Sequence, residues 1–169
     1  MNAEKKFRKL YEKMFDLCEE NGWGDPFSYA RSKEIHMAGL LGHKVSDSLA
    51  GADAYEQDGK PAEYKSTIGK RINATYNAIS VQPTWKKQVE YLKKEKIAKY
   101  QHHYHARYDG GKVAEMYQLK GDDVLKLLLP KIKRAYDRMN AGGVKKDPRL
   151  GATLSMSEIR KHGKKISCK

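Results

Sequence analysis

Hydrophobic side chains recur at helical spacing near the start of the chain. In residues 2–20 they fall three or four positions apart, which predicts a one-sided helix that ends at Asn21–Gly22. The apolar stripe comprises Phe7, Leu10, Tyr11, Met14, Phe15, Leu17 and Cys18. Such a stripe is covered either by the core of the same chain or by a second copy in a dimer. The pattern does not separate these two, and we take the core as the simpler expectation.

Four more helices are predicted from apolar spacing and capping residues. Their expected ranges are 26 or 28 to 41, 85 to 94, 123 to 139, and 155 to 163. Pro130 lies inside the long third range and is expected to kink that helix or to end its first half. Its expected buried stripe is Val124, Leu127, Leu128, Ile132 and Tyr136.

Turn residues predict two hairpins. Asp58–Gly59 is a turn dipeptide between short extended arms in residues 51–67. Residues 109–112, with two glycines, join the expected strands 97–108 and 113–119. The first hairpin matters most, because alternation along its second arm puts Glu63 and Lys65 on one face and Tyr64 on the other.

Three charged groups are expected to converge on the first hairpin. Asp53 on the opposite arm can meet Glu63 and Lys65 across the ladder. Two carboxylates suit a Mg²⁺ ion, and a neighbouring lysine can orient or help deprotonate water and offset charge on a phosphate. The alternative is an exposed hairpin with cross-strand ion pairs, which the spacing alone favours.

Charge is distributed unevenly along the chain. The chain has 169 residues and a net charge of +13. Its length predicts a single domain over residues 1–169. Residues 1–64 have 9 Lys and Arg against 12 Asp and Glu, whereas residues 65–169 have 25 against 9, a net charge of +16. Concentrating the positive charge in one part of the chain favours a nucleic-acid partner over general solubility.

The remaining composition predicts a cytoplasmic protein. No apolar run approaches a membrane span, and the first residues lack the apolar stretch of a secretory signal. Two cysteines near opposite ends fit a reducing compartment, with Cys18 as a small core residue and Cys168 as a tail thiol. We expect no membrane and no small-molecule substrate.

The segment after Lys65, residues 66–80, is rich in amides and hydroxyls. Asparagine can pair with adenine, a threonine methyl can touch thymine, and Arg and Lys can reach guanine or phosphate. The DNA-contact candidates are Lys70, Arg71, Asn73, Thr75, Tyr76 and Asn77. The alternative for this segment is an ordinary polar loop.

Two other groups carry weaker expectations. Glu34, in the middle of the expected second helix, is either a solvated carboxylate or an additional acidic group near the metal. Of the cluster His102, His103 and His105, only the last two share a strand face. No carboxylate accompanies them, so a structural metal there is disfavoured.

With these elements in place, the chain resembles the PvuII-like type II restriction endonucleases of the PD-(D/E)xK nuclease superfamily. Asp53 followed ten residues later by Glu63-Tyr64-Lys65 carries the motif. The resemblance continues in Ile97-Ala98-Lys99-Tyr100, in Met116-Tyr117-Gln118-Leu119 and in His162-Gly163-Lys164-Lys165-Ile166, with Lys33 and Gly42 in register upstream. It covers about residues 25–166.

This resemblance implies a mixed α/β fold with a central bent mixed sheet flanked by helices, and Mg²⁺-dependent cleavage of double-stranded DNA by a homodimer. Mn²⁺ is expected to substitute for Mg²⁺. Asp53 and Glu63 would be metal ligands, Lys65 the lysine that orients water, and Tyr100 a neighbour of the scissile phosphate. Lys99 is grouped with the DNA contacts. Residues 1–24 are a candidate dimerisation element, and residues 25–166 the catalytic and DNA-binding core.

The chain also departs from the family. The family reads bases through a histidine run after the catalytic strand, where this chain has Asn73 to Asn77, and an aspartate near the minor groove is replaced near Tyr29. The recognised base sequence is therefore not transferred. Two alternatives stay open: a homing or structure-selective nuclease on the same fold, and a DNA-binding protein without catalysis.

Overall fold

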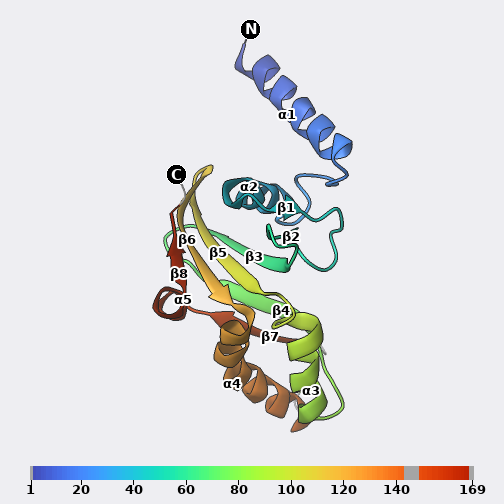
Figure 1. The fold of residues 1–169 in the computed structure, drawn as a ribbon, viewed down its shortest axis with the longest axis vertical. Coiled ribbons are helices and arrows are strands. Elements are labelled where there is room, and N and C mark those ends of the chain that lie inside the picture. The colour runs from blue at the N-terminus through green and yellow to red at the C-terminus, as the bar shows by residue number, and fades with distance from the viewer. Residues whose placement is uncertain (1, 143–148, 168–169) are drawn as a thin grey trace. The chain divides into compact units, whose positions relative to one another are not determined.

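The computed structural model describes residues 2–142 and 149–167, and it has a mixed α/β fold (Figure 1). Two compact units divide the chain, Met1–Lys60 and Pro61–Lys169. The sequence predicts one domain with a separate helix over residues 1–24, whereas the boundary between the units falls after the turn at Asp58–Gly59. Among the described residues, no helix is long and apolar enough to cross a membrane.

The first unit contains α1 (Ala3–Glu20), α2 (Arg31–Leu41), β1 (Lys44–Val45) and β2 (Ala54–Tyr55), the two strands being antiparallel. Helix α1 matches the predicted range: Asn2 caps it by accepting a hydrogen bond from the Lys5 amide at 3.1 Å, and Gly22 follows it with φ 65°. The expectation that its stripe is core is wrong for most positions. Phe7 is 70% exposed and Leu10 59%, while Cys18 is buried as predicted.

Helix α2 begins five residues later than its earliest predicted start. The carboxylate of Asp25 accepts hydrogen bonds from the Phe27 amide at 2.8 Å and the Ser28 hydroxyl at 3.1 Å, which holds a turn instead of a first helical turn. Gly42 ends the helix in the left-handed conformation, as predicted. Tyr29, in the intervening turn, is 97% exposed.

The predicted turn at Asp58–Gly59 is present, but its loop has three residues, 57–59, and not the two that were predicted. The Gly59 amide donates to the Glu56 carbonyl at 2.8 Å, and the Glu56 amide donates to the Lys60 carbonyl at 2.9 Å. Only Gly59, at φ 78°, takes a positive φ. This arrangement is a turn followed by a left-handed glycine, a common hairpin connection.

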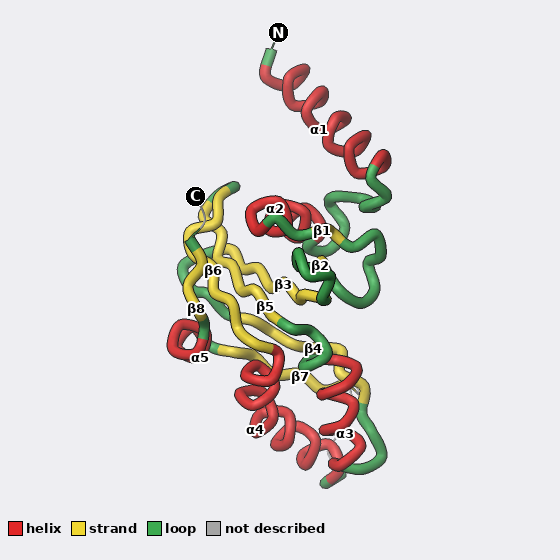
Figure 2. The backbone as a smooth tube through the Cα atoms, in the orientation of Figure 1, coloured by secondary structure: helices red, strands yellow, loops and turns green. Residues whose placement is uncertain are grey.

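The second unit is built on four strands: β3 (Pro61–Ile68), β5 (His102–Asp109), β6 (Lys112–Lys120) and β8 (Lys164–Ile166). Their order is β3-β5-β6-β8 (Figure 2). Strands β3 and β5 are parallel, and the other pairs are antiparallel. The β5–β6 hairpin confirms the predicted turn at residues 109–112. Strand β5 starts later than predicted, because residues 97–101 form bends before it.

A separate two-stranded antiparallel ribbon is made by β4 (Ala74–Ser80) and β7 (Arg149–Leu154). Residues 74–80 are therefore a strand and not a loop. Between Tyr76 and Ile79 the pairing register shifts, and Ala78 adopts φ 53°. This bulge interrupts the alternation that would otherwise have marked the strand in the sequence.

Helices complete the second unit. Helix α3 (Trp85–Tyr91) continues into a π-helical turn, η1 (Leu92–Lys96), and α5 (Met156–His162) opens with the predicted Ser155–Glu158 capping box. The long helix α4 (Gly121–Asn140) continues through Pro130, so the alternative in which Pro130 ends its first half is wrong, and the expected kink stays a prediction. Pro130 is on the exposed face, and the buried side chains on both sides of it hold the helix together.

The core of the second unit lies between α4, the ribbon and one face of the sheet. Its fully buried members include Ile72, Ile79, Leu128, Ile132 and Leu154. Of the stripe predicted for α4, Val124, Leu128, Ile132 and Tyr136 are buried, and Leu127 is partly buried against this cluster. At roughly 25 cal/mol per Å² of apolar surface, burying each such side chain contributes about 1.5–3 kcal/mol.

Candidate functional site

Glu63 and Lys65 lie next to each other on one face of β3. Side chains alternate along the strand, so Tyr64 between them is buried on the opposite face, where its ring meets that of Tyr104 edge-on at 5.7 Å between centroids. The Lys65 ammonium forms an ion pair with the Glu63 carboxylate. Both side chains are only partly exposed, 16% for Glu63 and 26% for Lys65. This pair is therefore half-buried, unlike the ion pair of an exposed hairpin.

The parallel neighbour β5 places two imidazoles beside this pair. Glu63 is in register with His103, and Lys65 with His105. Both imidazoles are fully buried, and the Tyr76 hydroxyl from β4 lies 2.9 Å from Nδ1 of His103 and 2.9 Å from Nε2 of His105. The Lys65 ammonium lies 5.3 Å from the centre of the Tyr76 ring. The predicted alternation found that His103 and His105 share a face, but not that Tyr76 joins them.

Burial keeps both imidazoles neutral. It lowers the pKa of His103 to about 4 and the pKa of His105 well below its ordinary value, because the charged ring would lose its hydration. The Glu63 carboxylate opposes this change at His103, and the Lys65 ammonium adds to it at both rings. At neutral pH the two imidazoles therefore add no charge beside the Glu63–Lys65 ion pair.

The other two acidic candidates belong to the first unit. Asp53 immediately precedes β2, and its backbone carbonyl accepts a hydrogen bond from the Ser46 amide at 3.1 Å. Glu34 is in the first turn of α2, not in mid-helix, and its carboxylate pairs with buried Arg31 at 3.3 Å. The Arg31 guanidinium also donates to the carbonyls of Trp23 and Ser46, so Glu34 balances a buried structural charge.

Tyr100 and Lys99 lie in the bends before β5. The Tyr100 side chain is buried and meets the His103 ring edge-on at 5.6 Å between centroids, while the exposed Lys99 places its ammonium 4.8 Å from the centre of the Tyr100 ring. The burial of Tyr100 argues against the expected position of its ring beside a phosphate. In this segment the exposed cation is Lys99.

The exposed face of the ribbon is polar. Asn73, immediately before β4, and Thr75 and Asn77 on it are exposed, whereas Ala74 and Tyr76 are buried. On β7 the exposed side includes Thr153, whose hydroxyl is 3.0 Å from that of Thr75. Tyr76, grouped with the base contacts in the sequence, is directed inward and its hydroxyl is already hydrogen-bonded. Replacing Tyr76 with asparagine or threonine would therefore not enlarge the polar face.

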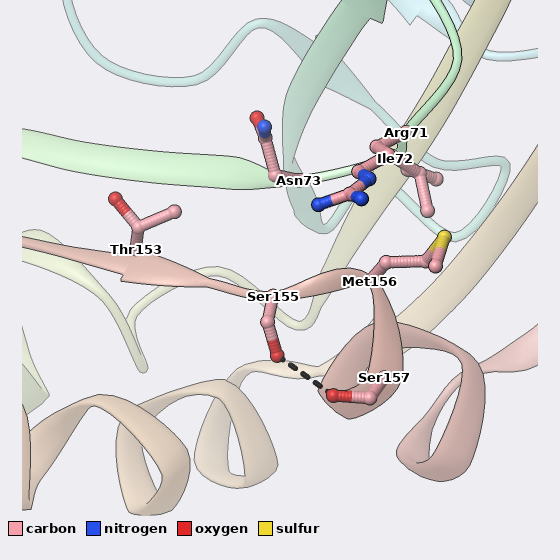
Figure 3. Close-up of a pocket in the computed structure, with 7 residues that line it drawn as sticks. All are labelled: Arg71, Ile72, Asn73, Thr153, Ser155, Met156 and Ser157. Atoms are coloured by element: carbon pink, nitrogen blue, oxygen red, sulfur yellow. Dashed lines mark hydrogen bonds between the residues drawn. The ribbon is translucent and has the colours of Figure 1, made fainter.

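One end of this face is hollowed. A depression of about 410 Å³ is lined by Arg71, Ile72, Asn73, Thr153, Ser155, Met156 and Ser157 (Figure 3). Its polar lining comes from the segment before β4, from β7 and from the start of α5. Arg71 and the neighbouring Lys70 are exposed here, and neither β4 nor β7 contains a carboxylate. The contribution of Thr153 was missed in the sequence because β7 was not predicted, whereas Ser155 was predicted only as a helix cap.

The chemistry of the Glu63 carboxylate fits a hard cation, since Mg²⁺ prefers oxygen ligands. In the described parts of the chain, no three His, Cys, Asp or Glu side chains are grouped so that they could hold a metal ion. His103 and His105 are better accounted for as partners of Tyr76. Compared with protein-family models and with curated proteins, the chain matches none of them.

Proposed function

We propose that the chain is a Mg²⁺-dependent, sequence-specific endonuclease that cuts double-stranded DNA, with the PD-(D/E)xK fold and type II restriction activity suggested by its motif. The observation that carries this proposal is the half-buried Glu63–Lys65 pair on one face of a strand in a mixed sheet. A carboxylate and an ammonium held this way, on a strand whose unit is strongly basic, have the chemistry of phosphodiester hydrolysis.

The residues have distinct roles in the proposed reaction. Glu63 and, as the motif predicts, Asp53 would hold the metal ion. When bound, this ion would act as a Lewis acid on the scissile phosphate. The Lys65 ammonium orients the attacking water and offsets the negative charge that develops on the phosphate. Partial burial strengthens both effects, because charges interact more strongly away from bulk water.

The ribbon is the proposed DNA-reading element. A two-stranded ribbon fits the major groove, where Asn73, Thr75 and Asn77 can contact base edges. Lys70, Arg71 and Lys99 would bind backbone phosphates and fix the position of the duplex. The net charge of +16 over residues 65–169 supports this assignment.

A homodimer completes the proposal. The exposed apolar stripe of α1, with Phe7 and Leu10 largely accessible, supports association with a second copy. Two identical subunits related by two-fold symmetry would each cut one strand of a palindromic site.

The decisive experiment is to incubate the protein with a random-sequence duplex library, Mg²⁺ or Mn²⁺, and to sequence the ends. We expect breaks at one short palindrome; a long asymmetric site would indicate a homing enzyme. Asp53→Ala, Glu63→Gln and Lys65→Ala should each lower cleavage by at least about 100-fold and leave duplex binding intact. Lys126→Ala, which removes an exposed cation from α4, is the matched control. Binding without cleavage by the wild type would identify a DNA-binding module instead.

A further inference from the structure

A buried polar cluster beside Lys65 has no role in the proposed hydrolysis as described so far. It consists of Tyr76 on β4 and of His103 and His105 on β5. The two imidazoles are completely buried and Tyr76 is nearly so, and their three polar groups contact one another within the core. Buried polar groups of this kind cost free energy unless each hydrogen bond is made, so their arrangement is informative.

The hydrogen bonds of the cluster have one consistent direction. Nε2 of His103 lies 3.0 Å from the Ile97 carbonyl, which can only accept, so this nitrogen carries the hydrogen. In the neutral ring Nδ1 is then an acceptor, and the Tyr76 hydroxyl donates to it. The phenol oxygen in turn accepts from Nε2 of His105. Both imidazoles are thereby fixed as the Nε2–H tautomer.

One atom at the end of this series of hydrogen bonds has no partner. Nδ1 of His105 is left as a bare lone pair, and it is the one buried side-chain polar atom in the described residues that lacks a hydrogen-bond partner. When Nε2 of His105 donates to the Tyr76 hydroxyl, Nδ1 of the same ring is left without a donor, and this costs free energy. The phenol is therefore held by one donor and one acceptor, and its ring orientation is fixed.

The fixed ring is the one next to Lys65. Its centre is 5.3 Å from the ammonium, within the range of a cation–π interaction, and the same ammonium pairs with Glu63. The histidines that hold the phenol are the register partners of these two residues on β3. One anchored aromatic ring and one carboxylate thus confine the ammonium.

We propose that Tyr76 is the positioning residue for Lys65: His103 and His105 hold its phenol, and its ring keeps the ammonium in place for the reaction. This inference rests on the proposed nuclease function, because it assigns a purpose to the placement of Lys65. It differs from a packing role, in which any apolar side chain of similar volume would serve.

The test compares Tyr76→Leu, which removes the ring, with Tyr76→Phe, which keeps the ring but removes its anchor. Tyr104→Phe is the matched control, because Tyr104 is a buried tyrosine on the opposite face of β5 whose hydroxyl accepts a hydrogen bond from Gln118 at 2.8 Å. The first readout is the NMR signal of the Lys65 side-chain methylene beside the ammonium, assigned by its absence in Lys65→Arg. We expect an upfield ring-current displacement that is lost in Tyr76→Leu, reduced in Tyr76→Phe and unchanged in Tyr104→Phe.

The second readout is cleavage at saturating duplex. Tyr76→Leu should lower kcat on the order of tenfold, with duplex affinity unchanged, and Tyr76→Phe should fall between it and the wild type. A Lys65 signal that does not respond to either Tyr76 variant overturns the inference. Because the NMR readout needs no activity, a protein that cuts no DNA but shows the expected signals would refute the nuclease proposal and leave the Lys65–Tyr76 coupling standing. Tyr76→Phe is nearly isosteric, so it serves if Tyr76→Leu does not fold.

Discussion

The α carbon of Gly121 packs directly against the carbonyl oxygen of Tyr100. A Cβ at residue 121 would overlap that oxygen and would also lie 3.2 Å from the Cα of Ala98. The Gly121 amide donates to the Gln101 carbonyl at 3.0 Å, so the start of α4 is fastened to the bends that carry Lys99. The absence of a side chain at this position thus lets α4 begin against the segment that leads into β5.

We expect Gly121→Ala to destabilise the protein by about 3 kcal/mol or more, because backbone must move to admit the methyl group. Gly111→Ala is the matched control: Gly111 is in the β5–β6 turn, has no positive φ, and a Cβ there meets nothing within 4 Å. Urea unfolding of both variants measures the difference. Equal urea midpoints for the two variants would show that the backbone around residue 121 accommodates a methyl group without loss of stability.

The buried histidines predict a loss of stability in mild acid. The native pKa of His103 is lowered to about 4 and that of His105 lies well below its ordinary value, against about 6.5 for a histidine in the unfolded chain, so the unfolded state binds more protons as the pH falls below 6.5. The free energy of unfolding is therefore greatest above pH 6.5 and declines toward pH 4, by about 3 kcal/mol for His103 alone.

Unfolding in urea at a series of pH values between 6.5 and 4.5 tests this expectation above the range in which Glu158 changes state. Burial raises the pKa of Glu158, but hydrogen bonds from Lys131 and Ser155 outweigh burial and bring that pKa to about 2. Its contribution is complete above about pH 4.5 and is lost as the pH falls through 2. His103→Gln should reduce the slope between pH 6.5 and 4.5; a flat profile in the wild type contradicts neutral burial of the histidines.

The proposed contacts of the ribbon with DNA should separate into two kinds. Arg71→Ala should weaken binding to all duplexes and reduce the slope of log affinity against log salt by about one, as loss of a phosphate contact does. Asn77→Ala should instead cost about 1–3 kcal/mol on the preferred sequence and little on others. Fluorescence anisotropy over a salt series distinguishes these, with Lys126→Ala as the charge control. Identical effects of Arg71→Ala and Lys126→Ala would remove Arg71 from the interface.

The exposed stripe of α1 predicts self-association. Leu10→Gln should shift the monomer–dimer equilibrium toward monomer by at least tenfold, since about 1.5 kcal/mol or more of apolar burial would be lost in each subunit. Lys9→Gln changes the adjacent exposed position without altering the stripe. Sedimentation at several concentrations measures both. A wild-type protein that remains monomeric at high concentration would leave the stripe without a second copy to cover it.

Helix α1, the turn at Gly59 and the β5–β6 hairpin could be predicted from the sequence because local signals agree there. For α1, the apolar period, the cap at Asn2 and the stop at Gly22 all indicate one helix. For the β5–β6 hairpin, the glycine at residue 110 indicates the turn. Strand β8 could not be predicted, because three residues are too few to show a period. Strand β7 could not be predicted either, because the glycine at its centre interrupts the strand pattern. For β4 the alternation Ile72, Ala74, Tyr76 was present, but the bulge at Ala78 ended it after three members.

The candidate site was predictable only in part. Alternation along residues 61–68 was sufficient to put Glu63 and Lys65 on one face, because it depends on a single strand. The contribution of Tyr76 could not be predicted, because its contact with His103 and His105 depends on how the ribbon packs on the sheet. Its neighbours Asn73 and Asn77 gave the segment a polar appearance, which concealed an inward-facing aromatic residue.

The ribbon places its packing residues and its proposed DNA contacts at different positions. Ala74, Tyr76 and Ile79 bind it to the core, while the side chains between them reach solvent and support nothing beneath them. Under the proposed function, related chains could therefore exchange Asn77, or Thr75 together with its hydroxyl partner Thr153, and acquire new target preferences without refolding. A library randomised at those three sites should yield many folded proteins, and the same library moved by one residue should yield few.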